Sequence, residues 1–73
     1  MDSTIPTAAM IKDSDIPRLH NMDIEWLVTR YHSKVRGLAF CLQYGYHKAS
    51  RVVENDARIL ASVISYKRTR DAA

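Results

Sequence analysis

The sequence predicts an all-α protein: an antiparallel two-helix hairpin that pairs with a second copy into a homodimeric four-helix bundle. Three observations lead to this prediction. Apolar residues recur at helical spacing in two segments, and Gly45 separates the two segments. The chain has only 73 residues, of which 47% are hydrophobic, which suits one small domain. We expect a loosely ordered N-terminal arm at residues 1–20 and the hairpin domain at residues 21–73.

The N-terminal arm lacks apolar periodicity. Two Ile-Pro pairs, at residues 5–6 and 16–17, bias the residue before each proline toward extended backbone. Much of the remaining arm is Ser, Thr and Asp, which favour turns and caps. We therefore expect residues 1–20 to be loosely ordered unless they dock on another surface. Asp15 or Ser14 is placed to cap a short helical turn there.

The first helix is expected at about residues 22–43. Asn21 is a favourable N-cap, and Gly45 suits the left-handed backbone that ends many helices. The apolar row of this helix alternates spacings of four and three residues, which keeps one face apolar. The row consists of Ile24, Val28, Tyr31, Val35, Leu38 and Leu42.

The second helix is expected at about residues 47–69, with two adjacent apolar rows. Glu54 and Arg58 lie four residues apart and are expected to form an ion pair on its outer face. Helices of similar length joined by a short turn pack antiparallel. The residues expected in the core or the dimer interface are Ile24, Val28, Tyr31, Val35, Leu38, Leu42, Val52, Ile59, Leu60 and Val63.

Asp56 interrupts an apolar row of the second helix. In an antiparallel hairpin that turns near Gly45, Asp56 lies opposite residue 34, so Lys34 or Tyr31 is its expected partner. A buried polar pair at this place would fix the register of the two helices. The alternative is a functional carboxylate.

A single hairpin buries little apolar surface for the chain it has to order, and this is the reason for expecting a dimer. The alternatives are a third element supplied by the N-terminal arm or an obligate hetero-partner.

Two stripes of small residues, at i+4 spacing, are expected to meet inside the hairpin. They are Thr29, Ser33, Gly37 and Cys41 on the first helix, and Ala57, Ala61 and Ser65 on the second. Gly37 is unfavourable inside a helix, so a close backbone approach would explain it.

Catalytic chemistry is not expected. No two of the three histidines and Cys41 stand three or four residues apart, so the spacing typical of metal ligands is missing. Cys41 lies in an apolar stretch, where a thiol is usually inert. We expect no catalytic residues, no metal, no cofactor and no small-molecule substrate.

A single cysteine, no long apolar run and no secretory signal predict a cytoplasmic protein without a membrane partner.

The aromatic residues suggest a binding surface for another protein. Tyr, Trp, Phe and Arg are the residue types enriched at the energetic centres of protein interfaces. The expected partner-binding residues are Trp26, Arg30, Phe40, Tyr44, Tyr46 and Arg51. The alternative is that Trp26 and Phe40 complete the dimer core and that Tyr44 and Tyr46 pack the turn. The expected function is that of a small regulator that inhibits or sequesters a larger partner, such as a transcription regulator or a motor ATPase. Small chains without catalytic groups are frequent among phage- and plasmid-encoded inhibitors and anti-activators, an argument by association only.

The alternative function is a helical dimer that binds nucleic acid. The chain carries a net charge of +3, and a basic helix face would contact phosphates. The candidate residues lie on the second helix: Lys48, Lys67, Arg68 and Arg70, with Arg51 nearby. Lysine and arginine also stabilise the C-terminal end of a helix, which explains part of this set without any ligand.

Overall fold

The computed structural model describes residues 11–72, and every regular element in this range is helical. A 3-10 turn, η1 (Asp13–Asp15), leads into the short helix α1 (Ile16–His20). Two long helices follow, α2 (Ile24–Gln43) and α3 (His47–Ala72). Residues 11–72 contain no strand, which confirms the all-α prediction.

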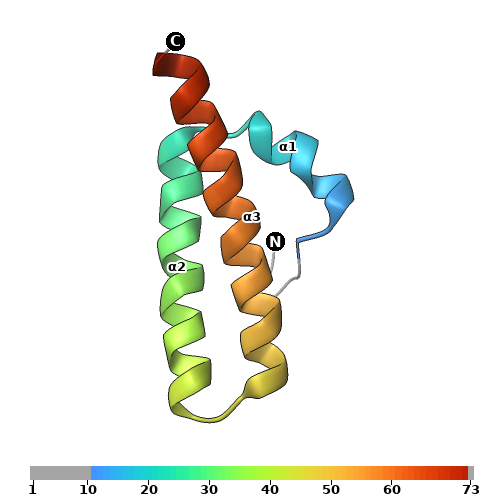
Figure 1. The fold of residues 1–73 in the computed structure, drawn as a ribbon, viewed down its shortest axis with the longest axis vertical. Coiled ribbons are helices and arrows are strands. Elements are labelled where there is room, and N and C mark those ends of the chain that lie inside the picture. Colours follow the sequence, from blue (N-terminus) through green and yellow to red (C-terminus); the bar gives the residue numbers. More distant parts are fainter. Residues whose placement is uncertain (1–10, 73) are drawn as a thin grey trace, which may run out of the picture.

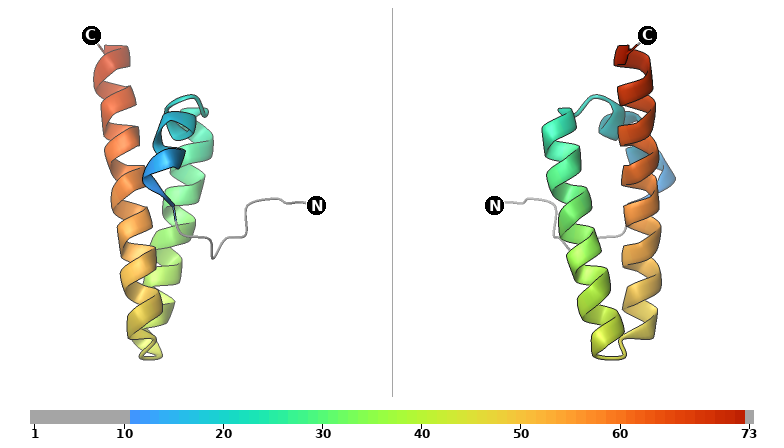
Figure 2. Two further views of the ribbon diagram at one scale, coloured as in Figure 1. Left: turned by 90° about the vertical axis from the view of Figure 1, so that its right-hand side faces the viewer. Right: turned by 60° about the vertical axis from the view of Figure 1, so that its left-hand side comes forward.

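The two long helices lie side by side and antiparallel (Figure 1). The turn between them forms one end of the molecule, which we call the tip. Helix α1 lies across one face of the pair, near the other end, and packs mainly on α3 (Figure 2). The α2–α3 pair is therefore covered by a third element on one face, over only part of its length.

The order seen in residues 13–20 differs from the expected loose arm. Pro17 stands in the first turn of α1, where a missing N–H costs nothing. The Asp15 carboxylate accepts a hydrogen bond of 3.0 Å from the backbone N–H of Lys12. Leu19 is buried in the core. Residues 13–20 are thus docked on the hairpin, which is the alternative of a third element that the sequence left open, and Asp15 is the N-cap of the short helix that holds Pro17. The remainder of the arm, residues 1–10, lies outside the described residues.

Helix α2 begins later than expected. Asp23 is its N-cap, whereas the expected cap, Asn21, is the C-cap of α1. The chain makes a separate helical turn before α2, so the N-cap of the long helix lies two residues after the expected one.

Helix α2 ends as the sequence predicts. Gly45 has a φ of 76°, in the left-handed region that favours glycine. The backbone N–H of Tyr46 donates to the carbonyl of Cys41 at 2.8 Å, the six-residue hydrogen bond typical of a Schellman ending.

The register of the two long helices is held by the ion pair that the sequence predicts. Lys34 Nζ lies 2.9 Å from Asp56 Oδ2, and the Asp56 side chain is fully buried. The other carboxylate oxygen accepts the backbone N–H of Ile11 at 2.9 Å. Asp56 therefore joins α2, α3 and the N-terminal segment at one point.

The main core lies toward the end of the molecule where α1 packs. Its buried members are Leu19, Leu27, Leu60, Val63 and Ile64. Several residues from the expected core pack against it while partly buried: Ile24, Val28, Tyr31 and Ile59. Leu38 and Val52 are also partly buried. Val35 and Leu42, in contrast, stay exposed in the single chain.

Helix α2 thus contacts α3 along a row other than its most apolar one. The buried row contains Leu27, Lys34 and Cys41, which are seven residues apart. At about 100° per residue, the expected row through Val35 and Leu42 is centred about 90° away. The apolar row of α2 is consequently covered where the core lies and open nearer the tip.

The small-residue stripes meet only in part. Cys41 and Ala57 are buried, but other residues of the two stripes, including Ser33 and Ala61, are exposed. A Cβ atom on Gly37 would lie 3.7 Å from the side chain of Val53, which is ordinary van der Waals contact. The expected close backbone approach at Gly37 is therefore not required.

Candidate functional site: the aromatic tip

The tip brings together three aromatic rings from both sides of the turn. The ring of Phe40 lies 4.6 Å from that of Tyr44 and 6.1 Å from that of Tyr46, between centroids. The Schellman ending explains this contact, because it places the residue after the glycine against the last turns of the helix. We call Phe40, Tyr44 and Tyr46 the tip cluster.

The tip cluster is open to solvent. Its three residues are between 54% and 59% exposed, and Leu42, on the other side of α2, is 59% exposed. The large exposed hydrophobic residues among those described are Val35, Phe40, Leu42, Tyr44, Tyr46 and Tyr66. All but Tyr66 fall between residues 35 and 46, in the half of the molecule near the turn. Such a concentration of exposed apolar surface is typical of an interaction site.

The expected partner-binding residues divide into two groups. Phe40, Tyr44 and Tyr46 form the tip cluster, and Arg51 is exposed nearby in the second turn of α3. Trp26 lies about 21 Å from Phe40 along α2, at 1.5 Å per residue. Trp26 is partly buried against the core, with the Arg30 guanidinium 5.1 Å from its ring centroid. The structure therefore does not join Trp26 and Arg30 to the tip cluster.

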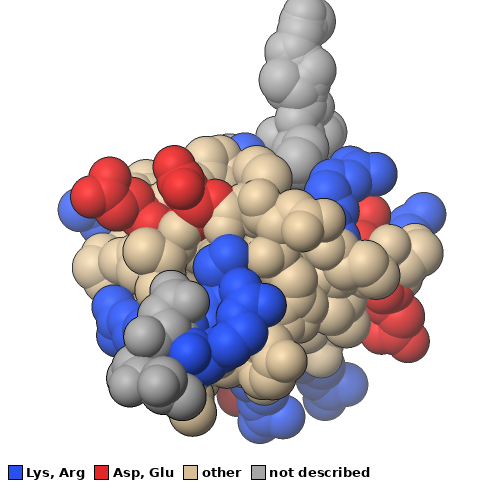
Figure 3. Space-filling model, turned by 90° about the horizontal axis from the view of Figure 1, so that it is seen from above, with Lys and Arg blue, Asp and Glu red and all other residues tan. Residues whose placement is uncertain are grey.

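The basic residues of α3 do not form one continuous patch. Lys67 Nζ donates a hydrogen bond of 2.9 Å to the carbonyl of His20, at the end of α1. The Arg70 guanidinium lies 5.8 Å from the ring of Tyr66, and Arg68 is exposed. Lys48 stands at the opposite end of α3, about 29 Å from Lys67 along the helix. Acidic side chains share the surface at the C-terminal end with the basic ones (Figure 3).

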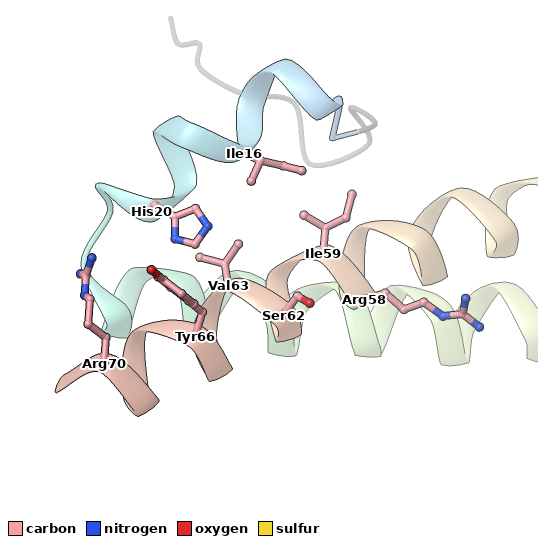
Figure 4. Close-up of a pocket in the computed structure, with 8 residues that line it drawn as sticks. All are labelled: Ile16, His20, Arg58, Ile59, Ser62, Val63, Tyr66 and Arg70. Carbon is pink, nitrogen blue, oxygen red and sulfur yellow. The ribbon is translucent and has the colours of Figure 1, made fainter. Parts of the chain in front are cut away.

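A shallow groove between α1 and α3 is a feature that the sequence did not reveal. Ile16 and His20 of α1 face Ile59, Val63 and Tyr66 of α3 (Figure 4). The ring of His20 meets that of Tyr66 edge to face, with centroids 5.1 Å apart. The sequence offered a short capped turn in this segment, but no pattern in it indicated where that turn would pack. A second shallow groove, between α2 and α3, includes Val28, Tyr31 and Ile64.

No constellation for metal or nucleophilic chemistry is found in the described part of the chain. Residues 11–72 hold no group of three or more His, Cys, Asp or Glu side chains able to bind a metal ion. Cys41 is a buried free thiol, whereas His32 and His47 are exposed. No helix within these residues has the length and apolar character needed to cross a membrane.

Comparison with known proteins adds no assignment. Protein-family models, curated proteins and solved structures all yield no match to this chain. The surface that the geometry singles out is therefore the tip cluster, on its own physical properties.

Proposed function

We propose that this protein is a small regulator that works by binding a larger protein, which it inhibits or sequesters. The supporting observation is the concentration of exposed large hydrophobic residues near the turn, where the ring of Phe40 lies against those of Tyr44 and Tyr46. Aromatic side chains of this kind supply much contact area at low entropic cost, and they dominate binding energy at interfaces. A transcription regulator or a motor ATPase remains the proposed type of target, and no catalytic activity is assigned.

We further propose that the chain forms a homodimer through the open part of the apolar row on α2. Val35 and Leu42 are 41% and 59% exposed in the single chain, and Leu38 lies between them. On a helix, these two residues lie about 140° to 160° around the axis from Phe40. A second copy packed on this row would leave the tip cluster free for the target.

The target interaction is tested by affinity capture from a lysate of the source organism, with nuclease present, followed by mass spectrometry. Tyr44→Ala is expected to reduce recovery of a defined protein about tenfold or more, as expected for an interface hot spot. Tyr66→Ala is the matched control, because Tyr66 is similarly exposed at the opposite end of the molecule. Equal recovery with both variants would remove the tip cluster from the site.

The dimer is tested by light scattering coupled to size-exclusion chromatography. Leu42→Glu is expected to give a monomer that keeps its helical circular dichroism, because this side chain is exposed in the single chain. Ser33→Glu adds the same charge on the opposite side of α2 and should remain dimeric. A wild-type monomer at high micromolar concentration would contradict the proposal.

The alternative proposal, binding to nucleic acid, draws on the exposed basic residues Lys48, Arg68 and Arg70. Their separation and the structural hydrogen bond of Lys67 make it the weaker candidate. Nuclease distinguishes it directly, because recovery through nucleic acid would vanish after digestion. Binding would also weaken steeply with salt.

A further inference from the structure

A continuous segment of the chain that contains the turn has no acidic residue. Residues 26–53 contain no Asp or Glu, but they hold five of the chain's 11 lysines and arginines. This segment therefore carries a formal charge of +5, and the rest of the chain carries −2, with histidines neutral. The net charge of the whole chain, +3, does not reveal this uneven distribution of charge.

Three of these cations are available at the surface. They are Arg36, Lys48 and Arg51, which are exposed and form no ion pair with any residue from 11 to 72. The other two have structural contacts: Lys34 pairs with the buried Asp56, and Arg30 lies over Trp26.

The three available cations border the tip cluster. Arg36 stands one helical turn before Phe40, so the two side chains share a face of α2. Lys48 follows Tyr46 by two residues, and Arg51 lies on the same side of α3 as Lys48. An apolar, aromatic centre is thus bordered by positive charge from both helices.

We propose that the tip docks on an acidic surface of the partner protein, with the tip cluster at the centre and Arg36, Lys48 and Arg51 at the rim. This inference rests on the proposed function and specifies its partner. Carboxylates would pair with the rim cations, which speeds encounter and selects the partner, while the rings supply contact area. The nearest acidic side chain in the sequence, Glu54, follows Arg51 by three residues and pairs with Arg58 at 3.4 Å, so it is directed away from the rim cations.

The geometry favours a protein over nucleic acid or a lipid surface. Phe40 lies against both tyrosine rings, so the rings pack on each other instead of standing apart as platforms for successive bases. The turn also contains polar Gln43 and His47, and Leu42 points to another side of α2 from Phe40. A membrane-inserting tip would present one continuous apolar face instead.

The test uses two synthetic peptides of about 18 residues, a length of about five helical turns. One peptide places Asp or Glu around Leu and Phe at helical spacing, and its twin replaces every acid with the corresponding amide. Binding to the full-length protein is followed by shifts of its backbone amide signals in nuclear magnetic resonance. The acidic peptide is expected to shift residues 36–51, and the amide twin to bind at least about tenfold more weakly.

Charge reversal locates the effect. Arg36→Glu combined with Lys48→Glu is expected to weaken acidic-peptide binding at least about tenfold, with helicity unchanged because both side chains are exposed. Arg58→Glu combined with Arg68→Glu makes the same change in net charge away from the tip and should leave binding within about twofold. The neutral variant Arg36→Gln with Lys48→Gln separates lost attraction from added repulsion.

Other outcomes overturn the inference. Equal binding of both peptides would show an apolar partner surface, leaving the proposed protein interaction intact but removing its acidic specificity. Stronger shifts with a single-stranded oligothymidine, or with anionic phospholipid vesicles, would replace the inference and the proposed function together. An absence of shifts with millimolar acidic peptide would also reject the acidic surface, whereas affinity capture of a defined protein would still support the function.

Discussion

At the end of the molecule where α1 packs, three helices share one core, whereas at the tip only two helices meet. The first end buries large side chains such as Leu27 and Leu60, which are almost fully excluded from solvent. Toward the tip the buried residues are small, namely Cys41, Ser50 and Ala57, and the large side chains face outward. The same pair of helices thus has a stabilised end and an exposed end.

One end of this short chain is closed by a buried core, and the other end is the open surface that we propose for binding. A third element supplies the extra burial that two helices lack, and the tip needs no such cover because Gly45 and the ring contacts fix its shape. The ion pair between Lys34 and Asp56 lies between these regions and keeps the helices in register. Substitutions near α1 should therefore affect folding, and substitutions at the tip should affect binding.

The largest expected effect comes from breaking the connection between the two ends. Asp56→Ala leaves the largely buried ammonium of Lys34 and the N–H of Ile11 without this carboxylate. We expect the free energy of unfolding to fall by about 3–5 kcal/mol, measured by urea denaturation. Glu54→Ala removes an exposed carboxylate of the same helix, and it should change the free energy of unfolding by less than about 1 kcal/mol. Similar losses in both variants would mean that Asp56 does not hold the ends together.

One identical substitution at each end sharpens the comparison. Leu60→Ala should lower the free energy of unfolding by about 2–5 kcal/mol, because Leu60 is buried in the core near α1. Leu42→Ala near the tip should change the stability of the monomer by about 0.5 kcal/mol or less. Denaturation at concentrations where the chain is monomeric checks both values. A large loss for Leu42→Ala in the monomer would show that the tip is part of the core after all.

A smaller effect is expected from the turn itself. Gly45→Ala forces a side chain into left-handed backbone, which should cost about 1 kcal/mol. Thermal unfolding measures this loss, and a Gly37→Ala variant is the control. Alanine is the better helix former and finds only ordinary contact at position 37, so that variant should be neutral or stabilising. Destabilisation by Gly37→Ala would reveal tighter packing between the helices than this fold contains.

Much of the hairpin was predictable because local rules governed it. The alternating spacing of apolar residues identified the helices at residues 24–43 and 47–72 to within three residues at each end. The antiparallel register followed from the turn at Gly45, and it offered Lys34 or Tyr31 as the partner of Asp56, of which Lys34 is the partner found. The Glu54–Arg58 pair was also predicted and is present on the outer face of α3 at 3.4 Å.

The sequence predicted which types of residue belong to the candidate site, but not which of those residues lie together in space. Phe40, Tyr44 and Tyr46 were chosen for their aromatic character, and the helix ending brought them together. Trp26 was chosen for the same reason, yet it lies against the core about 21 Å away along the helix. Composition does not distinguish an aromatic residue in a core from one at a surface.

The sequence by itself determined the helices, the turn and the buried charge pair, since these depend on periodicity, on glycine backbone and on pairing of opposite charges. Only the tertiary structure decided which row of α2 meets α3 and how α1 packs. The row of Leu27, Lys34 and Cys41 faces α3, although the row of Val35 and Leu42 is more apolar. Leu19 completes the core through contacts distant in sequence, and such contacts leave no local pattern from which to predict them.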